Sequence, residues 1–195
     1  MNEPHEMIST ADNAGSKHIK KINLSQDFRR SGYFETGQLE KITDNVISAI
    51  KGGRFIAISG IVGSGKTTVL RQIQNRLKSE TDVIVSRSYA LEKHKVSLST
   101  LFTALFLDLS NEDSRNLNVK VHKDNKKNTQ ELIRLIQDKG KNVVLLIDDA
   151  HDLPSHTVID LKKLIKTINN IFSNAERIWF SVVLAGHPRV RLKVA

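Results

Sequence analysis

Eight consecutive residues match G-x-x-x-x-G-K-[ST], a pattern that binds the phosphates of a nucleotide. They are Gly60, Ile61, Val62, Gly63, Ser64, Gly65, Lys66 and Thr67. Glycines let the backbone bend tightly, so that its N–H groups point at a polyphosphate without side chains in the way. Lys66 is expected to reach the β- and γ-phosphates of ATP, and the Thr67 hydroxyl to ligate Mg²⁺. We therefore predict that the segment from Gly60 to Thr68 binds ATP and Mg²⁺, with Lys66 also acting in catalysis.

The segments on either side of this loop have the pattern that such a loop requires. Residues 54–59 predict a short buried strand, and residues 66–78 predict an amphipathic helix. The apolar face of that helix consists of Val69, Leu70, Ile73 and Leu77. Its first turn adds N–H donors and the positive end of the helix dipole. The alternative interpretation is a glycine-rich turn between a strand and a helix, with no ligand.

A second candidate site follows an apolar run. Residues 142–148 (NVVLLID) predict a central parallel strand covered on both faces, and Asp149 comes directly after it. Binding sites in such sheets lie beyond the carboxyl ends of the strands. Asp148 is expected to hold Mg²⁺, which prefers oxygen ligands, and Asp149 to orient or deprotonate the attacking water. The alternative is an acidic turn without a catalytic role.

Four further side chains have two interpretations each. His187 is placed to sense the γ-phosphate, or it is an ordinary loop histidine. His151, just after the two acids, fits a hydrogen-bonding residue behind the site better than a metal ligand. Tyr33 and Phe34 would pack beside an adenine ring or within the core.

The rest of the chain alternates predicted helices and strands. Helices are expected at residues 38–50, 98–109, 129–137 and 155–172, and strands at residues 82–86 and 178–185. The first of these helices should bury Leu39, Ile42, Val46 and Ile50. The pair Gly52-Gly53 and the single Gly140 are expected to end helices, and a serine at 97 or 99 to begin one. Residues 111–128 are polar and predict a surface excursion.

This alternation predicts an α/β fold, a three-layer α/β/α core with a mostly parallel central sheet. Residues 1–27 are polar and unpatterned and predict a disordered tail, followed by one domain of residues 28–195.

Composition restricts the class of protein. The chain has no cysteine, no apolar run near the ~18 residues of a membrane span, and no secretory signal, so we expect a cytoplasmic protein without a membrane span. Its formal charge is +9, from 30 Lys and Arg against 21 Asp and Glu. That balance favours polyanionic partners such as nucleic acid, and a lysine-rich solvated surface explains it equally well.

Together the motifs resemble the AAA+ ATPases, in the branch of transposition-helper ATPases and general-secretion-pathway A proteins. The resemblance runs from about Tyr33 to Leu192 and rests on YF, GIVGSGKTT, VVLLIDDAHDL and VVLAGHPRVR. The loop and acid motifs are specific to P-loop ATPases as a group. The H-D-L continuation and the A-G-H-P turn indicate the branch. The resemblance implies ATP hydrolysis and ATP-dependent assembly on double-stranded DNA with a transposase as partner.

The chain departs from this family in three places. Asp149 stands where a glutamate is usual, and His187 stands near a usual glutamine. The arginine finger, the last core strand and the helical lid of the class would lie beyond Ala195. We therefore expect a core that lacks the C-terminal lid, turns over slowly and self-assembles only if that part is supplied.

Three alternatives stay open. In the first, the chain is a non-hydrolysing nucleotide-binding remnant. In the second it is a secretion-pathway A type ATPase, and in the third a small-molecule phosphotransferase. The secretion relatives continue into a membrane span and a wall-binding region that are not found here, and a phosphotransferase would have an arginine-rich lid. Both observations favour the DNA-associated ATPase.

Overall fold

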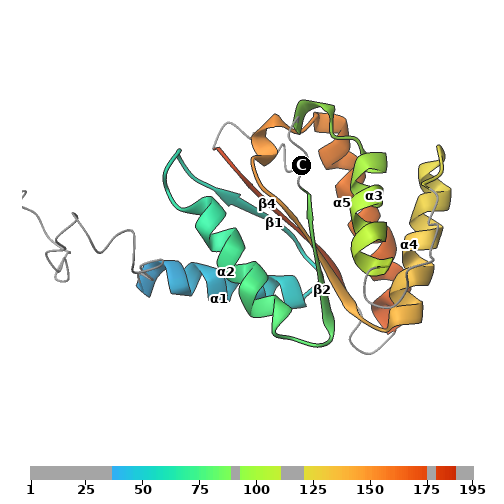
Figure 1. Cartoon of the computed structure of the whole chain (residues 1–195), viewed down its shortest axis with the longest axis horizontal. Coiled ribbons are helices and arrows are strands. Elements are labelled where there is room, and N and C mark those ends of the chain that lie inside the picture. The colour runs from blue at the N-terminus through green and yellow to red at the C-terminus, as the bar shows by residue number, and fades with distance from the viewer. Residues whose placement is uncertain (1–36, 89–92, 111–120, 175–178, 188–195) are drawn as a thin grey trace, which may run out of the picture. The chain divides into compact units, whose positions relative to one another are not determined.

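Helices and strands alternate along the chain, as Figure 1 shows. A computed structural model describes residues 37–88, 93–110, 121–174 and 179–187. The helices are α1 (Gly37–Lys51), α2 (Lys66–Lys78), α3 (Leu98–Ser110), α4 (Asn125–Lys139) and α5 (Ser155–Ile171). The strands are β1 (Phe55–Ser59), β2 (Val83–Ser88), β3 (Asn142–Ile147) and β4 (Phe180–Gly186). Short 3-10 helices span Lys93–Lys95, Ala150–Asp152 and Phe172–Asn174.

In the described residues the four strands form one parallel sheet in the order β1-β4-β3-β2. The register pairs Phe55 with Val182, Val143 with Phe180, and Val83 with Asn142. Because all strands run the same way, their carboxyl ends meet at one edge. That edge holds the loop after β1 and the acids after β3, with the end of β4 between them. The predicted α/β class with a parallel sheet is confirmed.

Helices cover both faces of this sheet, which makes three layers (Figure 1). One face carries α1 and α2, and the other carries α3 and α5, with α4 packed against α3. Side chains of β3 contribute to the cores on both faces of the sheet. Val143, Leu145 and Ile147 belong to the core under α3 and α5. Val144 and Leu146 belong to the core under α1 and α2. This alternation follows from the two-residue period of a strand.

Several helix ends lie where the sequence predicts them. The Gly53 backbone follows α1 with φ 65°, and Gly140 ends α4 with φ 60°. Both are left-handed conformations that glycine adopts without steric cost. The Ser97 hydroxyl accepts from the Thr100 backbone N–H at 3.3 Å, so Ser97 is the capping serine of α3.

Helix α4 begins at Asn125, earlier than the expected residue 129, so the predicted surface excursion is wrong for residues 125–128. Two side chains explain this start. The Asp124 carboxylate accepts from the Lys126 backbone N–H, and the buried Asn128 amide bonds the backbone of His122 on both its N–H and its C=O. Polar residues form this first turn through local hydrogen bonds, so a prediction based on the spacing of apolar residues does not detect it.

The inward face of α1 also differs from the prediction. Ile42 is 37% exposed, while Thr43 is buried and donates to the Leu39 carbonyl and to Gln72 of α2. Thr43, whose hydroxyl is hydrogen-bonded, therefore occupies a buried position on the face where Ile42 was predicted.

Some boundaries shift by two residues or fewer. Strand β2 continues through Ser88 past the expected residue 86, and β4 begins at Phe180 rather than 178. The predicted tail of residues 1–27 and the candidates Tyr33 and Phe34 lie outside the described residues.

Candidate nucleotide-binding site

The loop between β1 and α2 has the backbone of a phosphate cradle. Gly63 and Gly65 have φ of 81° and 87°, in the region where a side chain is strained. A Cβ on Gly60 would lie 2.4 Å from the Ser64 hydroxyl oxygen, so a larger residue here would displace the Ser64 side chain. The Gly60 N–H donates to the Gly186 carbonyl at 3.2 Å, which ties the loop to the end of β4.

The ammonium of Lys66 lies over this loop. Its Nζ donates to the carbonyls of Gly60 at 2.8 Å and Ile61 at 2.7 Å. These two bonds hold a positive charge at the rim of the cradle, which is the position that a polyphosphate needs. Within the described helix α2, the first turn carries no acidic residue and its N-cap, Gly65, makes no side-chain cap. The N-terminal N–H groups therefore suit an anion.

One cavity of about 340 Å³ joins the loop to side chains from two other strand ends. It is lined by Val62, Gly63, Gly65, Lys66, Thr67, Thr68, Asp149, His151 and His187. The sequence-predicted Gly60, Ile61 and Ser64 shape the loop beside it. The tertiary structure thus brings the second acid and the candidate sensor to the loop, from which each is more than eighty residues away in the chain.

The two acids after β3 have different surroundings. Asp149 has φ 50°, a left-handed conformation that aspartate and asparagine adopt more readily than most residues, and its side chain enters the cavity. Asp148 is only 14% exposed. Its Oδ1 accepts from the Asp149 N–H at 3.0 Å, and its Oδ2 lies 3.7 Å from a guanidinium nitrogen of Arg87.

Sequence reasoning missed Arg87, because it ended the second strand at Ser86. With β2 extended to Ser88, Arg87 pairs in register with Leu146 and shares a strand face with Val83 and Val85. The signal available in the sequence was the position of Arg87, which continues the alternation of Val83 and Val85 along one face of the strand.

The two histidines lie side by side at the cavity. The ring centroids of His151 and His187 are 6.4 Å apart, and His151 Nε2 is 3.6 Å from a carboxylate oxygen of Asp152. His187, at the end of β4, faces the loop from between the two motif-bearing strands. Its position is compatible with a phosphate-contacting role.

The donor set fits the cation that the motifs imply. The Thr67 hydroxyl and the Asp148 carboxylate are hard oxygen donors of the kind Mg²⁺ prefers. Thr67 lines the cavity at the start of α2, whereas Asp148 directly follows β3, the strand beside β4, and is not among the described residues that line this cavity. Of the helices that the structure describes, none is both long and apolar enough to cross a membrane.

Comparison with known proteins bears on the family and the fold of the chain. The sequence profile of the AAA domain family matches residues 49–194. A curated relative, the energy-coupling factor transporter ATP-binding protein EcfA2 of Clostridium tetani (strain Massachusetts / E88), is 34% identical over 83 residues. That match covers 43% of this chain and 27% of the relative.

Solved structures show the same fold at low sequence identity. Cdc6p of Pyrobaculum aerophilum has a TM-score of 0.55 at 15% identity, over 84% of this chain and 43% of that one. The ORC2 protein of Aeropyrum pernix, in ADPNP-ADP complexes, has a TM-score of 0.53 at 14% identity, over 84% and 45%. The chain therefore spans less than half the length of each protein that it matches here.

Proposed function

The chain belongs to the AAA domain family and contains an ATP-binding domain of the AAA ATPase type, and we propose that it hydrolyses ATP with the help of Mg²⁺. The observation that carries this proposal is the shared cavity of Lys66, Thr67 and Asp149. A phosphate-binding cation, a metal-binding hydroxyl and a water-orienting carboxylate then face one space. This combination is what hydrolysis of a terminal phosphate requires.

Each residue has one role in this proposal. The loop N–H groups and Lys66 bind the phosphates, and Thr67 and Asp148 hold the cation. Bound Mg²⁺ would neutralise charge that develops on the phosphate oxygens. Asp149 orients the attacking water and accepts its proton.

Substitution of Lys66 tests the site. Because its ammonium already lies on the loop carbonyls, Lys66→Ala should lower Mg-ATP affinity at least tenfold, the effect of losing one charge-assisted contact. Isothermal titration measures the affinity, and a melting curve shows that the fold persists. Lys78→Ala, at the exposed far end of α2, is the matched control. Equal affinity of a folded Lys66→Ala protein and the control would refute the site.

A role as accessory ATPase in DNA transposition, with double-stranded DNA and a transposase as partners, is the finer part of the proposal. It is supported by the net charge of +9 and by the HDL and AGHP segments after β3 and β4. A cytoplasmic location, where ATP and DNA are available, belongs to this proposal. Phosphate release with and without duplex DNA tests it, since an accessory ATPase acting on DNA should respond to the duplex.

The second candidate function is nucleotide binding without hydrolysis. The shorter side chain of Asp149, where the resembled family has glutamate, favours it. A wild-type protein that binds Mg-ATP and releases no phosphate would establish this alternative.

A further inference from the structure

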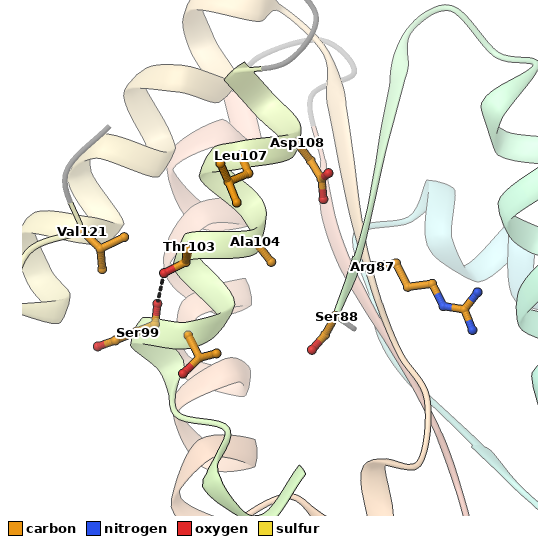
Figure 2. Close-up of a pocket in the computed structure, with 9 residues that line it drawn as sticks. Arg87, Ser88, Ser99, Thr103, Ala104, Leu107, Asp108 and Val121 are labelled. Atoms are coloured by element: carbon orange, nitrogen blue, oxygen red, sulfur yellow. Dashed lines mark hydrogen bonds between the residues drawn. The ribbon is translucent and has the colours of Figure 1, made fainter. Parts of the chain in front are cut away.

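Arg87 lies on the opposite face of β2 from its neighbour Ser88. Figure 2 shows Ser88 directed toward α3 and Arg87 directed away from it. Both residues line a cavity of about 510 Å³ together with α3 and Val121, and Ser88 directs its side chain toward it (Figure 2). The side chain of Arg87 instead reaches the α2 side of the sheet, where one guanidinium nitrogen lies 3.5 Å from the Gln74 amide oxygen.

On that side Arg87 meets the acid at the end of the next strand. Its second guanidinium nitrogen lies 3.7 Å from Asp148 Oδ2, and the two side chains are 17% and 14% exposed. The other carboxylate oxygen, Oδ1, accepts the Asp149 N–H at 3.0 Å. Both oxygens of Asp148 therefore have a protein partner, one of them a cation from a neighbouring strand.

We propose that Arg87 is a charge competitor at the metal site: it pairs with Asp148 Oδ2 and competes with Mg²⁺ for that oxygen. The proposal rests on the proposed function, in which Asp148 holds the cation for ATP. Arg87 compensates the charge of the carboxylate while the cation is absent, and it yields part of this contact when the cation is bound.

The physical reason is that two cations share one poorly exposed carboxylate. Charges that are mostly removed from solvent are screened little by salt, so the guanidinium and Mg²⁺ disfavour each other at this oxygen. Coupling of this kind is reciprocal, so removal of the arginine must change how much Mg²⁺ improves ATP binding.

The quantity to measure is the dissociation constant of ATP in EDTA divided by its dissociation constant in excess Mg²⁺, both from isothermal titration. Arg87→Met keeps an unbranched stem similar to the aliphatic part of arginine and removes the charged guanidinium. It should raise this ratio about tenfold, the factor expected for loss of a partly buried charged partner. Arg87→Lys keeps the charge on a shorter side chain and should raise the ratio less than Arg87→Met does.

Matched variants make each outcome decisive. Arg76→Met removes the same charge from α2, where Arg76 pairs with Asp44, and should leave the ratio unchanged. If Arg87→Met does not melt like the wild type, Arg87→Gln is judged by the same ratio. An unchanged or lowered ratio in a folded charge-removed variant overturns the proposal. Failure of the wild type to bind ATP at all would instead overturn the proposed function.

Discussion

The side-chain amide of Asn169 in α5 donates to the Gly53 carbonyl at 2.7 Å, and so joins a helix to the turn that leads into the loop-bearing strand. The same amide bonds both backbone groups of Phe180, donating to its carbonyl at 3.0 Å and accepting from its N–H at 2.9 Å. One side chain thus fixes the start of β1 relative to the start of β4. These two strands carry the loop and His187 at their other ends.

Replacement of Gly53 should destabilise the protein. Gly53 has φ 65°, and an added Cβ would lie 2.8 Å from the Asn169 amide nitrogen. Gly53→Ala should lower the free energy of unfolding by about 2–4 kcal/mol, from the left-handed backbone and the disturbed hydrogen bonds together. Denaturant titration measures this. Gly52→Ala is the control, since its Cβ would meet its nearest atom at an ordinary 3.4 Å. Equal stability of the two variants would contradict the prediction.

The shape of the phosphate loop depends on Gly60 and Ser64. Gly60→Ala places a methyl group 2.4 Å from the Ser64 hydroxyl oxygen, so the Ser64 side chain must shift within the loop. We expect ATP affinity to fall by about tenfold or more, because the loop N–H groups lose their common direction. The double variant Gly60→Ala with Ser64→Ala removes the hydroxyl and should recover part of the affinity. No recovery, or no loss in the single variant, would show that this contact does not determine the loop.

Substitution of Asp149 should lower the rate of ATP hydrolysis without changing the affinity for Mg-ATP. Asp149→Asn should keep Mg-ATP affinity and lower the hydrolysis rate by about 10²- to 10⁴-fold, because an amide does not accept the proton of water. Asparagine tolerates φ 50° as aspartate does, so the fold should persist. Steady-state phosphate release measures the rate, with Asp152→Asn three residues further on as control. Equal rates in the wild type and Asp149→Asn would remove Asp149 from the mechanism.

DNA binding should follow from charge. With a net charge of +9 and 5% aromatic residues, affinity should come from phosphate contacts rather than base stacking. We expect sequence-independent duplex binding with a Kd of roughly 10⁻⁴ to 10⁻⁶ M at physiological salt, weakening steeply as salt rises. Fluorescence anisotropy with two unrelated duplexes at several salt concentrations measures both features. Absence of binding even at low salt would exclude this role.

The loop and its two flanking elements were predictable from sequence alone. The helix after it spans Lys66–Lys78 as expected, and its predicted face of Val69, Leu70, Ile73 and Leu77 is buried. The physical reason is that these features are local. Glycine conformations and helical periodicity act over a few residues, and a fully apolar run such as β3 requires burial on both faces.

The arrangement around the loop was decided by tertiary structure. Parallel pairing of β2 with β3 brings Arg87 to Asp148, sixty-one residues away, and the place of β4 between β1 and β3 brings His187 beside His151. Strand order and register depend on contacts between distant segments, which no local pattern contains. The same holds for the left-handed turn that directs Asp149 into the cavity while Asp148 stays with Arg87.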